Sequence, residues 1–525
     1  MGLSNLALFS IVATLILCSS SLADAGDATT IIVGAGMSGI MAAKTLFEKG
    51  IKDFVILEAT NRIGGRMHKK MVGGYPIEMG ANWVQGVGSR ENVNPIWTLA
   101  NKYNLLTFKS NYDNISYNIY DQEGGILPQS VVAEPYERAL ASSEFSENLS
   151  LTFRENGEED ISILASQRVS GHVPTTPLEM AIDFFVYDYE TAEPPRVTSL
   201  KNVEPSATFE DYGVDNYFVA DSRGYEHVVH RLAQEFLESS NGKIIDKRLK
   251  LNKVVRKIEY GDSGVKVSTE DGSVYTAKNS IVSVSAGVLQ TKLIEFKPDL
   301  PMWKLLAIYK WDMAIYCKIF VKFPYKFWPT GGPGTEFFMY VHERRGYYNN
   351  WQHLENEYPG GNLLMVTVVD EEARRIEQQP EEDTKTEIMQ VLRKMFGKNI
   401  PEMSDILIPK WGQDRFYKGT FSNWPIGVSE QDFHELKAAV GPVFFSGEHT
   451  NQEYNGYVHG AYLAGIDTAN MVLDCINDGN CANNSTLTKK TPVLADARAR
   501  PEIKLGKMFG TRARRKAPVE RKFSV

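Results

Sequence analysis

Apolar runs and helical periodicity alternate near the N-terminus. Residues 30–33 (TIIV) form an apolar run that suits a buried parallel strand. A glycine-rich turn follows at residues 34–39 (GAGMSG), and apolar residues then recur at helical spacing as far as Gly50. Residues 53–58 (DFVILE) suit a second buried strand that ends in an acid. Strand, glycine turn, helix, strand and acid together predict a βαβ dinucleotide-binding unit.

Later segments predict further strands and a helix. Four segments punctuated by turn residues predict antiparallel strands: residues 253–260, 265–269, 274–276 and 280–285. Residues 442–448 predict a late strand that ends in Gly and Glu, and residues 456–473 predict a helix after it. We therefore expect an α/β fold whose nucleotide-binding domain is built from both ends of the chain, with the residues between them supplying a substrate domain.

The three glycines of the turn have different duties. In such a unit Gly34 permits the tight turn, Gly36 lets the backbone approach the pyrophosphate, and Gly39 packs the helix against the strand. Free N–H groups at the helix N-terminus then face the phosphates. Glu58 is placed to accept hydrogen bonds from ribose hydroxyls. A glycine-rich turn without a ligand is the alternative, but the strands, the helix and the acid in register favour a dinucleotide.

The chain of 525 residues is 43% apolar, which favours two or more domains. Residues 1–25 resemble a secretory signal, because the apolar run at 6–17 is followed by small residues and an Ala-Asp-Ala cleavage signature. That run is shorter than the roughly 20 residues that span a bilayer. A buried N-terminal helix and a retained anchor are the alternatives. No other stretch predicts a membrane span.

The cysteines and sequons agree with a secretory route. Cys475 and Cys481 can pair in an oxidising compartment or stay free, and pairing would leave Cys317 as a buried thiol. Glycosylation sequons begin at four asparagines: Asn114, Asn148, Asn483 and Asn484.

Charge is unevenly distributed along the chain. Residues 489–525 carry twelve Lys or Arg and three acids, so they hold a net +9, and the whole chain's −8 leaves about −17 for the rest. An acidic body suits a cationic substrate through electrostatic steering and argues against nucleic-acid binding. We expect residues 481–525 to be a disordered tail, with cell-wall polyanion binding or a sorting role as alternatives.

Several motifs resemble those of the flavin-containing amine oxidases. Residues 58–66 (EATNRIGGR) with 80–83 (GANW) are similar to the FAD signature of that family, and residues 445–450 and 456–461 are similar to its second flavin segment. Within the family, residues 187–196, 316–320 and 416–421 are similar to secreted plant polyamine oxidases. The resemblance covers nearly all of residues 29–480.

The resemblance implies FAD as cofactor and two domains, one Rossmann-like and one an α+β substrate domain. We place the FAD-binding domain at residues 26–107, 226–310 and 411–480, and the substrate-binding domain at 108–225 and 311–410. Besides the glycines and Glu58, the resemblance implies these cofactor-binding residues: Arg66, Gly80, Ala81, Asn82, Trp83, Val255, Trp411, Glu448, Tyr457 and Val458. The resemblance also implies these substrate-binding residues: Gln85, Tyr189, Glu190, Tyr316, Phe421 and Tyr457.

Amine oxidation sets requirements of its own. A hydride leaves the carbon beside a nitrogen whose lone pair must be free, yet an amine with a pKa near 10.4 costs about 6 kcal/mol to deprotonate near pH 6. The site must therefore bind a polycation and lower the pKa of one nitrogen by desolvation. Carboxylates at the mouth and aromatic walls near the flavin would do both. Burial of a distal cation against a ring face adds about 0.5–2 kcal/mol.

Two residues have a structural and a functional interpretation. Lys318 lies in an apolar segment, where pattern alone allows an alternating strand with the lysine facing water; the resemblance implies that it holds a water against the flavin. Glu190 can belong to the solvated face of an amphipathic helix, whereas the resemblance implies that it anchors a distal ammonium. Gln85 stands where relatives have a second acid, which puts affinity for the most charged amines and the side of cleavage in doubt.

The sequence thus predicts a monomeric FAD-dependent polyamine oxidase that uses spermidine or spermine and O₂. We expect an aminoaldehyde, a diamine (1,3-diaminopropane) and H₂O₂ as products. Oxidation of another amine, back-conversion to a shorter polyamine, or a flavin-bound protein without turnover are the alternatives. No metal-ligand or nucleophile-elbow motif supports a zinc or serine hydrolase. We expect secretion to the cell wall, with the vacuole as the alternative.

Overall fold

The computed structural model describes residues 28–113, 115–330 and 335–478. The predicted signal at 1–25, the tail at 481–525, Cys481 and the sequons at Asn114, Asn483 and Asn484 lie outside these residues. Asn148 lies in a long helix, and Cys317 is a buried free thiol. Within the described residues, no helix combines the length and apolarity needed to cross a bilayer.

The first sheet contains the predicted βαβ unit. Strand β1 (Ala28–Val33) pairs in parallel with β2 (Phe54–Leu57), and α1 (Met37–Glu48) connects them. On its other side β1 pairs with β14 (Val274–Val282), which in turn pairs in parallel with the late strand β23 (Val443–Phe445). The strand order is β11-β2-β1-β14-β13-β12-β15, with β23 beside β14. The remaining strands are β11 (Leu249–Lys250), β12 (Val255–Gly261), β13 (Gly264–Thr269) and β15 (Glu295–Lys297).

One expected break in this sheet is absent. We predicted separate strands at 274–276 and 280–285, but residues 274–282 form the single strand β14. Ala277, in the segment between them, pairs with β13 on one side and with β1 on the other, so the strand continues without a turn. The first half of β14 pairs with β13, and the second half pairs with β1 and β23. The late helix is also longer than predicted, since α15 runs from Val458 to Asp478.

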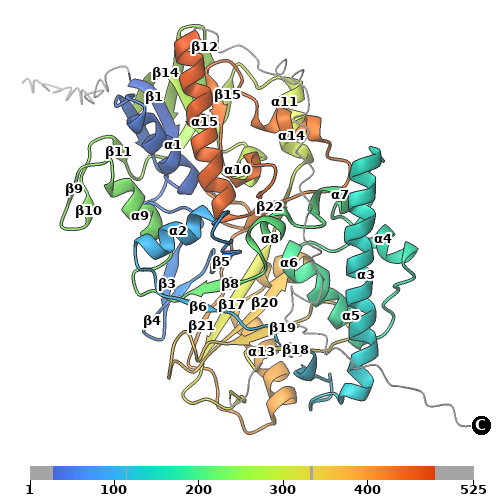
Figure 1. Cartoon of the computed structure of the whole chain (residues 1–525). Helices are drawn as coiled ribbons and strands as arrows, with labels where there is room; N and C mark the ends of the chain where they lie inside the picture. The colour runs from blue at the N-terminus through green and yellow to red at the C-terminus, as the bar shows by residue number, and fades with distance from the viewer. Residues whose placement is uncertain (1–27, 114, 331–334, 479–525) are drawn as a thin grey trace, which may run out of the picture.

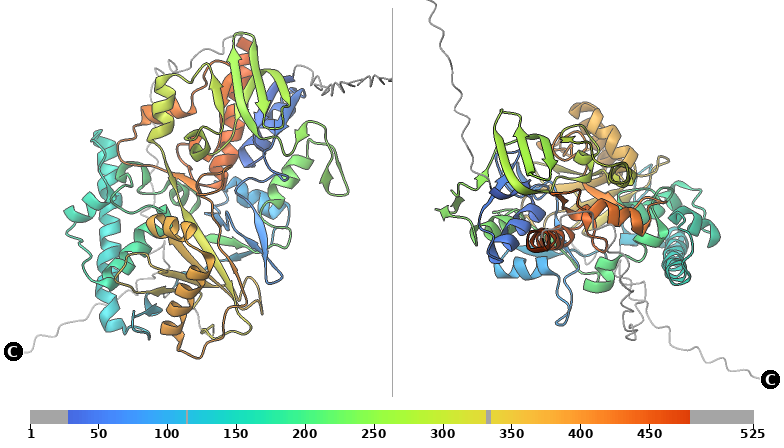
Figure 2. Two further views of the ribbon diagram at one scale, coloured as in Figure 1. Left: turned by 180° about the vertical axis from the view of Figure 1, so that it is seen from behind. Right: turned by 90° about the horizontal axis from the view of Figure 1, so that it is seen from above.

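Helix α15 packs against α1, although the two are far apart in sequence (Figures 1 and 2). Both cover the same face of the first sheet with α2 (Pro95–Lys102) and α9 (His227–Gln234). Helices α11 (Met302–Lys310) and α14 (Glu430–Lys437) cover the opposite face. The N-terminal and C-terminal segments therefore share one hydrophobic core.

The second sheet belongs to the middle of the chain, in the lower half of Figure 1. Its strand order is β21-β17-β20-β19-β18-β7. The strands are β7 (Ile119–Tyr120), β17 (Tyr316–Lys322), β18 (Phe337–Tyr340), β19 (Asn350–His353), β20 (Leu363–Val369) and β21 (Asp405–Leu407). The 28-residue helix α3 (Gln129–Asn156) and α5 (Pro177–Asp183) cover one face, whereas α12 (Asp370–Gln378) and α13 (Glu381–Phe396) cover the other.

Smaller elements connect the two sheets. The small sheets comprise β3 (Lys69–Val72) with β4 (Tyr75–Glu78), β5 (Trp83–Gln85) with β8 (Asn216–Val219) and β6 (Thr107–Lys109), β16 (Asp312–Ala314) with β22 (Phe421–Asn423), and β9 (Ser239–Ser240) with β10 (Lys243–Ile244). The short helices are η1 (Ile115–Tyr117), α4 (Ile163–Val169), η2 (Phe184–Asp188), α6 (Tyr189–Thr191), α7 (Leu200–Val203), α8 (Ala207–Tyr212), α10 (Ala286–Leu289) and η3 (Glu448–Thr450).

Candidate active site

A cavity of about 1210 Å³ is lined by residues from both sheets. Pockets for drug-sized ligands have volumes of roughly 300–1,000 Å³. This cavity therefore has room for an extended dinucleotide and a second molecule. Every predicted site residue lines it, with the exception of Gly39.

The glycine turn between β1 and α1 has the geometry of a phosphate cradle. Gly34 has a φ of +105°, and a Cβ there would lie 2.6 Å from Ser283 Oγ. A Cβ on Gly39 would lie 2.1 Å from the carbonyl oxygen of Gly34, so Gly39 packs the helix against the turn and stays outside the cavity. At Gly36 the nearest atom to such a Cβ would be 3.8 Å away. Gly36 is thus open towards the cavity, at the uncapped start of α1.

Glu58 follows β2 and faces the same cavity. Its Oε2 accepts the N–H of Ala35 at 2.8 Å, which ties the acid to the glycine turn, and its Oε1 accepts the N–H of Thr60 at 2.9 Å. Oε1 also accepts the hydroxyl of Thr60 at 2.7 Å, whereas Oε2 has a second lone pair with which it can accept a ribose hydroxyl. The turn, the uncapped helix and this acid together fit a dinucleotide.

Arg66 and Glu448 join two distant segments beside the cavity. Arg66 Nη1 donates to Glu448 Oε1 at 2.8 Å, and Glu448 Oε2 accepts the N–H of Gly456 at 2.8 Å. Burial opposes the charge on Glu448, but Arg66 holds the pKa of that carboxyl below its usual value. The pair therefore fixes the start of α15 against the segment that follows β2.

Eight other predicted cofactor residues line the cavity. Gly80 is required by close packing, because a Cβ there would lie 1.7 Å from the carbonyl oxygen of Arg66. Trp411 Nε1 donates to the carbonyl oxygen of Met79 at 3.0 Å. The others are Ala81, Asn82, Trp83, Val255, Tyr457 and Val458.

Lys318 projects from β17 into the cavity and is only 7% exposed. Its Nζ donates to the carbonyl oxygen of Gly80 at 2.5 Å and lies 5.3 Å from the ring centroid of Trp83. Burial lowers the pKa of Lys318 to about 7, although the carboxyl group of Glu78 opposes this shift. The alternative of a lysine facing water is therefore wrong, because this face of β17 packs inside the protein.

Glu190 lines the cavity from α6. Its Oε1 accepts the hydroxyl of Tyr457 at 3.0 Å and the amide of Gln85 at 3.5 Å. Burial raises the pKa of the Glu190 carboxyl to about 7, and the hydrogen bond from Tyr457 opposes the shift. The alternative of a solvated helix face is also wrong. Gln85 lies beside Glu190 as a hydrogen-bond donor.

A buried clamp holds the segment that carries Glu190. Residues 184–188 form the π-helical turn η2, immediately before α6. Arg345, from the connection between β18 and β19, pairs with Asp183 at 2.8 Å before this turn and with Asp188 at 2.6 Å at its end. Both acids are at most 5% exposed.

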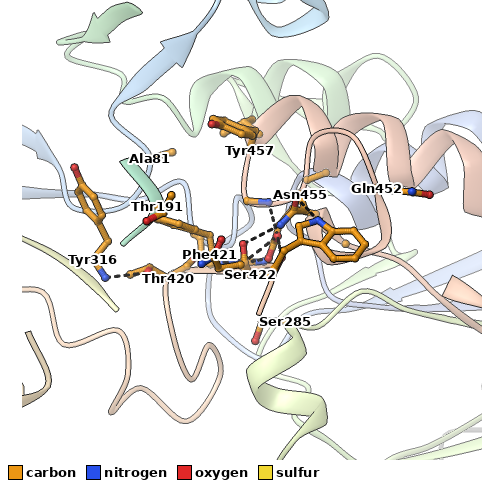
Figure 3. A pocket seen from close by; sticks show the side chains of 18 of the residues that line it. Ala81, Thr191, Ser285, Tyr316, Thr420, Phe421, Ser422, Gln452, Asn455 and Tyr457 are labelled. Atoms are coloured by element: carbon orange, nitrogen blue, oxygen red, sulfur yellow. Dashed lines mark hydrogen bonds and ion pairs between the residues drawn. The ribbon is translucent and has the colours of Figure 1, made fainter. Parts of the chain in front are cut away.

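Aromatic side chains form the walls of the cavity. The Tyr316 ring lies 6.0 Å from that of Tyr189 and 5.9 Å from that of Phe421, between ring centroids. Lys318 Nζ lies 5.4 Å from the Tyr316 ring. Figure 3 shows Tyr457 and Phe421 on opposite sides of an open space, with Ala81 and Thr191 beside it. These walls suit an extended, partly apolar chain.

Further acids in the cavity lining were not predicted from the sequence. Glu147 comes from α3, Glu204 from the segment after α7, and Glu210 from α8. Burial raises the pKa of Glu204 to about 8, and the neighbouring Glu147 and Glu190 raise it further. No local motif identifies these acids, because only the fold brings their elements together. The cavity thus combines carboxyl groups with aromatic walls, as a polycation requires.

Comparisons with known proteins agree with this geometry. The family model described as "Flavin containing amine oxidoreductase" matches residues 37–473. The chain is 55% identical over 468 residues to Polyamine oxidase 1 of Zea mays, covering 88% of this chain and 93% of that protein. It is 53% identical over 489 residues to Polyamine oxidase 6 of Oryza sativa subsp. japonica, covering 92% and 98%. A solved structure of putrescine oxidase bound to putrescine aligns with a TM-score of 0.68 at 19% identity, covering 85% of this chain and 99% of that one.

Proposed function

Because this chain belongs to the flavin-containing amine oxidoreductases and uses FAD, we propose that it oxidises spermidine or spermine at the carbon next to a secondary amine. Hydrolysis of the resulting imine gives an aminoaldehyde and a diamine, 1,3-diaminopropane, and O₂ is reduced to H₂O₂. The relatives named polyamine oxidase, at 53–55% identity, support this substrate class.

The observation that carries the proposal is the position of Glu190 in an aromatic slot that also contains Lys318. A polyamine must place one neutral nitrogen near the flavin while a second, charged nitrogen lies further along the chain. Glu190 binds the distal ammonium, and Tyr457 orients the carboxylate by donating a hydrogen bond to it. Tyr316 and Phe421 desolvate the reacting nitrogen and so favour its neutral form.

When bound, FAD supplies the hydride acceptor and passes the electrons to O₂. The glycine turn and Glu58 hold its phosphates and ribose. Lys318, with a pKa lowered to about 7 by burial, positions a water beside the reacting carbon and exchanges a proton with it. That water hydrolyses the imine or assists the reoxidation of the flavin by O₂.

The side of cleavage depends on how deeply the polyamine enters. The amide of Gln85 donates to Glu190 and adds no negative charge, so a single carboxylate sets the register of the substrate at this point. A bound ammonium lowers the pKa of the carboxyl groups beside it, so the acids at 147, 204 and 210 supply the remaining counter-charge once a longer amine binds.

The test is anaerobic mixing of purified protein with spermidine, followed by admission of air and mass identification of products. Rapid bleaching of the flavin absorbance and 1,3-diaminopropane among the products support the proposal. Bleaching with a shorter polyamine as product would establish back-conversion. A yellow protein that polyamines fail to bleach would move the substrate to another class of amine.

We further propose that the protein is secreted to the cell wall, on the basis of the signal-like residues 1–25 and the sequons, and that it acts there as a monomer. The basic residues of 481–525 would then bind wall polyanions or direct sorting to the vacuole. Fractionation of cells expressing the full chain, and the chain truncated after residue 480, distinguishes these destinations.

A further inference from the structure

A buried row of polar side chains crosses the second sheet from Lys318. Lys318 of β17 lies opposite Thr367 of β20 in the strand register, and Thr367 lies opposite Asn350 of β19. Cross-strand neighbours share one face of a sheet, with Cβ atoms about 5 Å apart. Thr367 and Asn350 are 1% and 2% exposed. The row is therefore closed to bulk solvent.

The row continues to the buried carboxyl group of Glu336, whose charge acts on a second buried carboxyl group, that of Glu357. Gln352 lies two residues after Asn350 on the same face of β19, and its Nε2 donates to Glu336 Oε1 at 2.9 Å. Glu357 is 3% exposed. Burial raises the pKa of Glu357 to about 8, and the nearby charge of Glu336 raises it further. The pair therefore holds a proton at neutral pH.

A second set of contacts connects Lys318 to Glu336. The Trp83 ring, which lies 5.3 Å from Lys318 Nζ, has its Nε1 donating to Ser110 Oγ at 3.0 Å. The hydroxyl of Ser110 in turn hydrogen-bonds to Glu336. Lys318 and Glu336 thus border one polar layer of the protein.

Five side-chain atoms along this row have no hydrogen-bond partner among the described residues. They are Asn350 Oδ1 and Nδ2, Gln352 Oε1, and Glu357 Oε1 and Oε2. An unpaired buried polar group costs about 1–3 kcal/mol. In native proteins nearly all such groups bind protein or ordered water. Their concentration in one row therefore points to a bound ligand.

The chemistry of Asn350 identifies the class of that ligand. Its Nδ2 needs an acceptor and its Oδ1 needs a donor, and both lack one whichever way the amide is oriented. Water supplies both, whereas a cation would leave Nδ2 unpaired. Within the described ranges, no group of three His, Cys, Asp or Glu side chains is arranged to hold a metal ion.

We propose that this row is an interior water site, in which ordered water molecules bridge Thr367, Asn350 and Gln352 and connect Lys318 to the carboxyl pair Glu336–Glu357. The waters carry a proton between these groups. When the Lys318 ammonium gives up a proton it becomes a neutral amine, and one carboxylate becomes a carboxylic acid; the reverse transfer restores both. The existence of the water site does not depend on the proposed function, whereas proton transfer to and from Lys318 during turnover does.

The first test is a crystal structure of the holoenzyme at a resolution that shows ordered solvent. We expect water within about 3 Å of both amide atoms of Asn350 and of Glu357. Asn350→Leu should expel the water at Asn350, whereas Met339→Leu, which changes the apolar neighbour opposite Asn350, should retain it. A dry row, or a cation in it, overturns the proposal.

The second test addresses the proton. Infrared spectra of the holoenzyme should contain a band from a buried carboxylic acid that Glu357→Gln removes. Asn350→Leu should slow flavin reoxidation by air about tenfold or more and leave flavin content unchanged, with Met339→Leu as the control. Gln352→Met replaces Asn350→Leu if that variant does not fold. If the water is ordered but Asn350→Leu leaves the rate of flavin reoxidation unchanged and no carboxylic-acid band is found, the proton role is overturned. If polyamines cannot reduce the flavin of the wild-type enzyme, that result counts against the proposed function alone.

Discussion

At the scale of single residues, the environment of Lys318 decides its chemistry. A buried lysine with a pKa near 7 can gain or lose a proton under ordinary conditions, which an exposed lysine cannot. The side chain is buried because β17 is covered on both faces. The same burial that costs free energy thus prepares the group for proton exchange.

Lys318→Met should lower the turnover number for spermidine by about 10²-fold or more, since removing a positioned proton-exchange group has effects of that size. Flavin content should be retained, because the hydrogen bond of Lys318 goes to the backbone of Gly80 and the glycine turn and Glu58 are left intact. Lys322→Met is the matched control, because Lys322 lies on the same strand and face and its Nζ donates to the carbonyl oxygen of Gly361 at 2.7 Å. Equal losses in both variants would refute the role of Lys318.

Glu190→Gln should raise KM for spermidine about tenfold to 100-fold, because the distal ammonium loses its counter-charge. A monoamine without a distal ammonium should show no such change. In the wild type, kcat/KM should rise as pH increases through about 7, since Glu190 is a carboxylate above its pKa and neutral below it. That inflection should be absent in the variant, and its persistence would assign the titration to another group.

At the scale of elements, Gly36 and Gly39 of one turn give opposite predictions. Gly39→Ala places a Cβ 2.1 Å from the backbone oxygen of Gly34, so the βαβ unit must shift and both stability and flavin content should fall. Gly36→Ala meets no protein atom closer than 3.8 Å, so the protein should fold with unchanged apoprotein stability and bind flavin more weakly. Thermal melts of the apoproteins and flavin absorbance separate the two effects. Equal melting temperatures for both variants would contradict this assignment.

The clamp from Arg345 positions Glu190 through the turn η2. Arg345→Lys replaces a planar fork that reaches Asp183 and Asp188 with a single ammonium, so the turn should loosen. We expect KM for spermidine to rise about tenfold while kcat changes less. Arg344→Lys is the control, because Arg344 lies in the same connection but pairs with Glu372 of α12, away from η2. If Arg345→Lys lowers the amount of folded protein and leaves KM unchanged, the clamp has only a structural role.

The sequence could predict what local pattern encodes and could not predict what distant elements assemble. Residues 30–58 contain the whole βαβ signal in one stretch, and Lys318 and Glu190 were identified by resemblance. Glu147 reaches the cavity from α3 and Glu204 from the segment after α7, so no spacing reveals them. The unbroken strand β14 was missed because its two halves pair with different neighbours.

At the scale of the whole molecule, buried carboxyl groups tie stability to pH. Burial, before any other cause, raises the pKa of these carboxyl groups: Glu78, Glu190, Glu193, Glu204 and Glu357, to between about 7 and about 9. The folded chain then holds more protons than the unfolded one above pH 4.5. The stabilisation that these carboxyl groups contribute to the folded chain is complete below pH 4.5 and is lost as the pH rises through 7 to 9.

We therefore expect the apoprotein to melt at a lower temperature at pH 8.5 than at pH 6.5, by about 3 °C or more. Buried Lys318 and Lys304 oppose this trend, because their pKa values are lowered, but they are fewer than the carboxyl groups. Glu193→Gln should reduce the difference, since Glu193 is buried and lies outside the proposed substrate and flavin contacts. A melting temperature that rises over this range would contradict the assignment.

The pairing of the first and last segments has a consequence for the order in which the chain folds. Strand β1 ends at residue 33, but β23 begins at residue 443 and α15 at residue 458. Such sequence-distant contacts slow folding, because the chain must close a long loop before they form. At about 5–20 residues per second, synthesis of the intervening chain takes tens of seconds. During that time the apolar face of α1 lacks the cover of α15, so we expect the nascent chain to depend on chaperones to avoid aggregation.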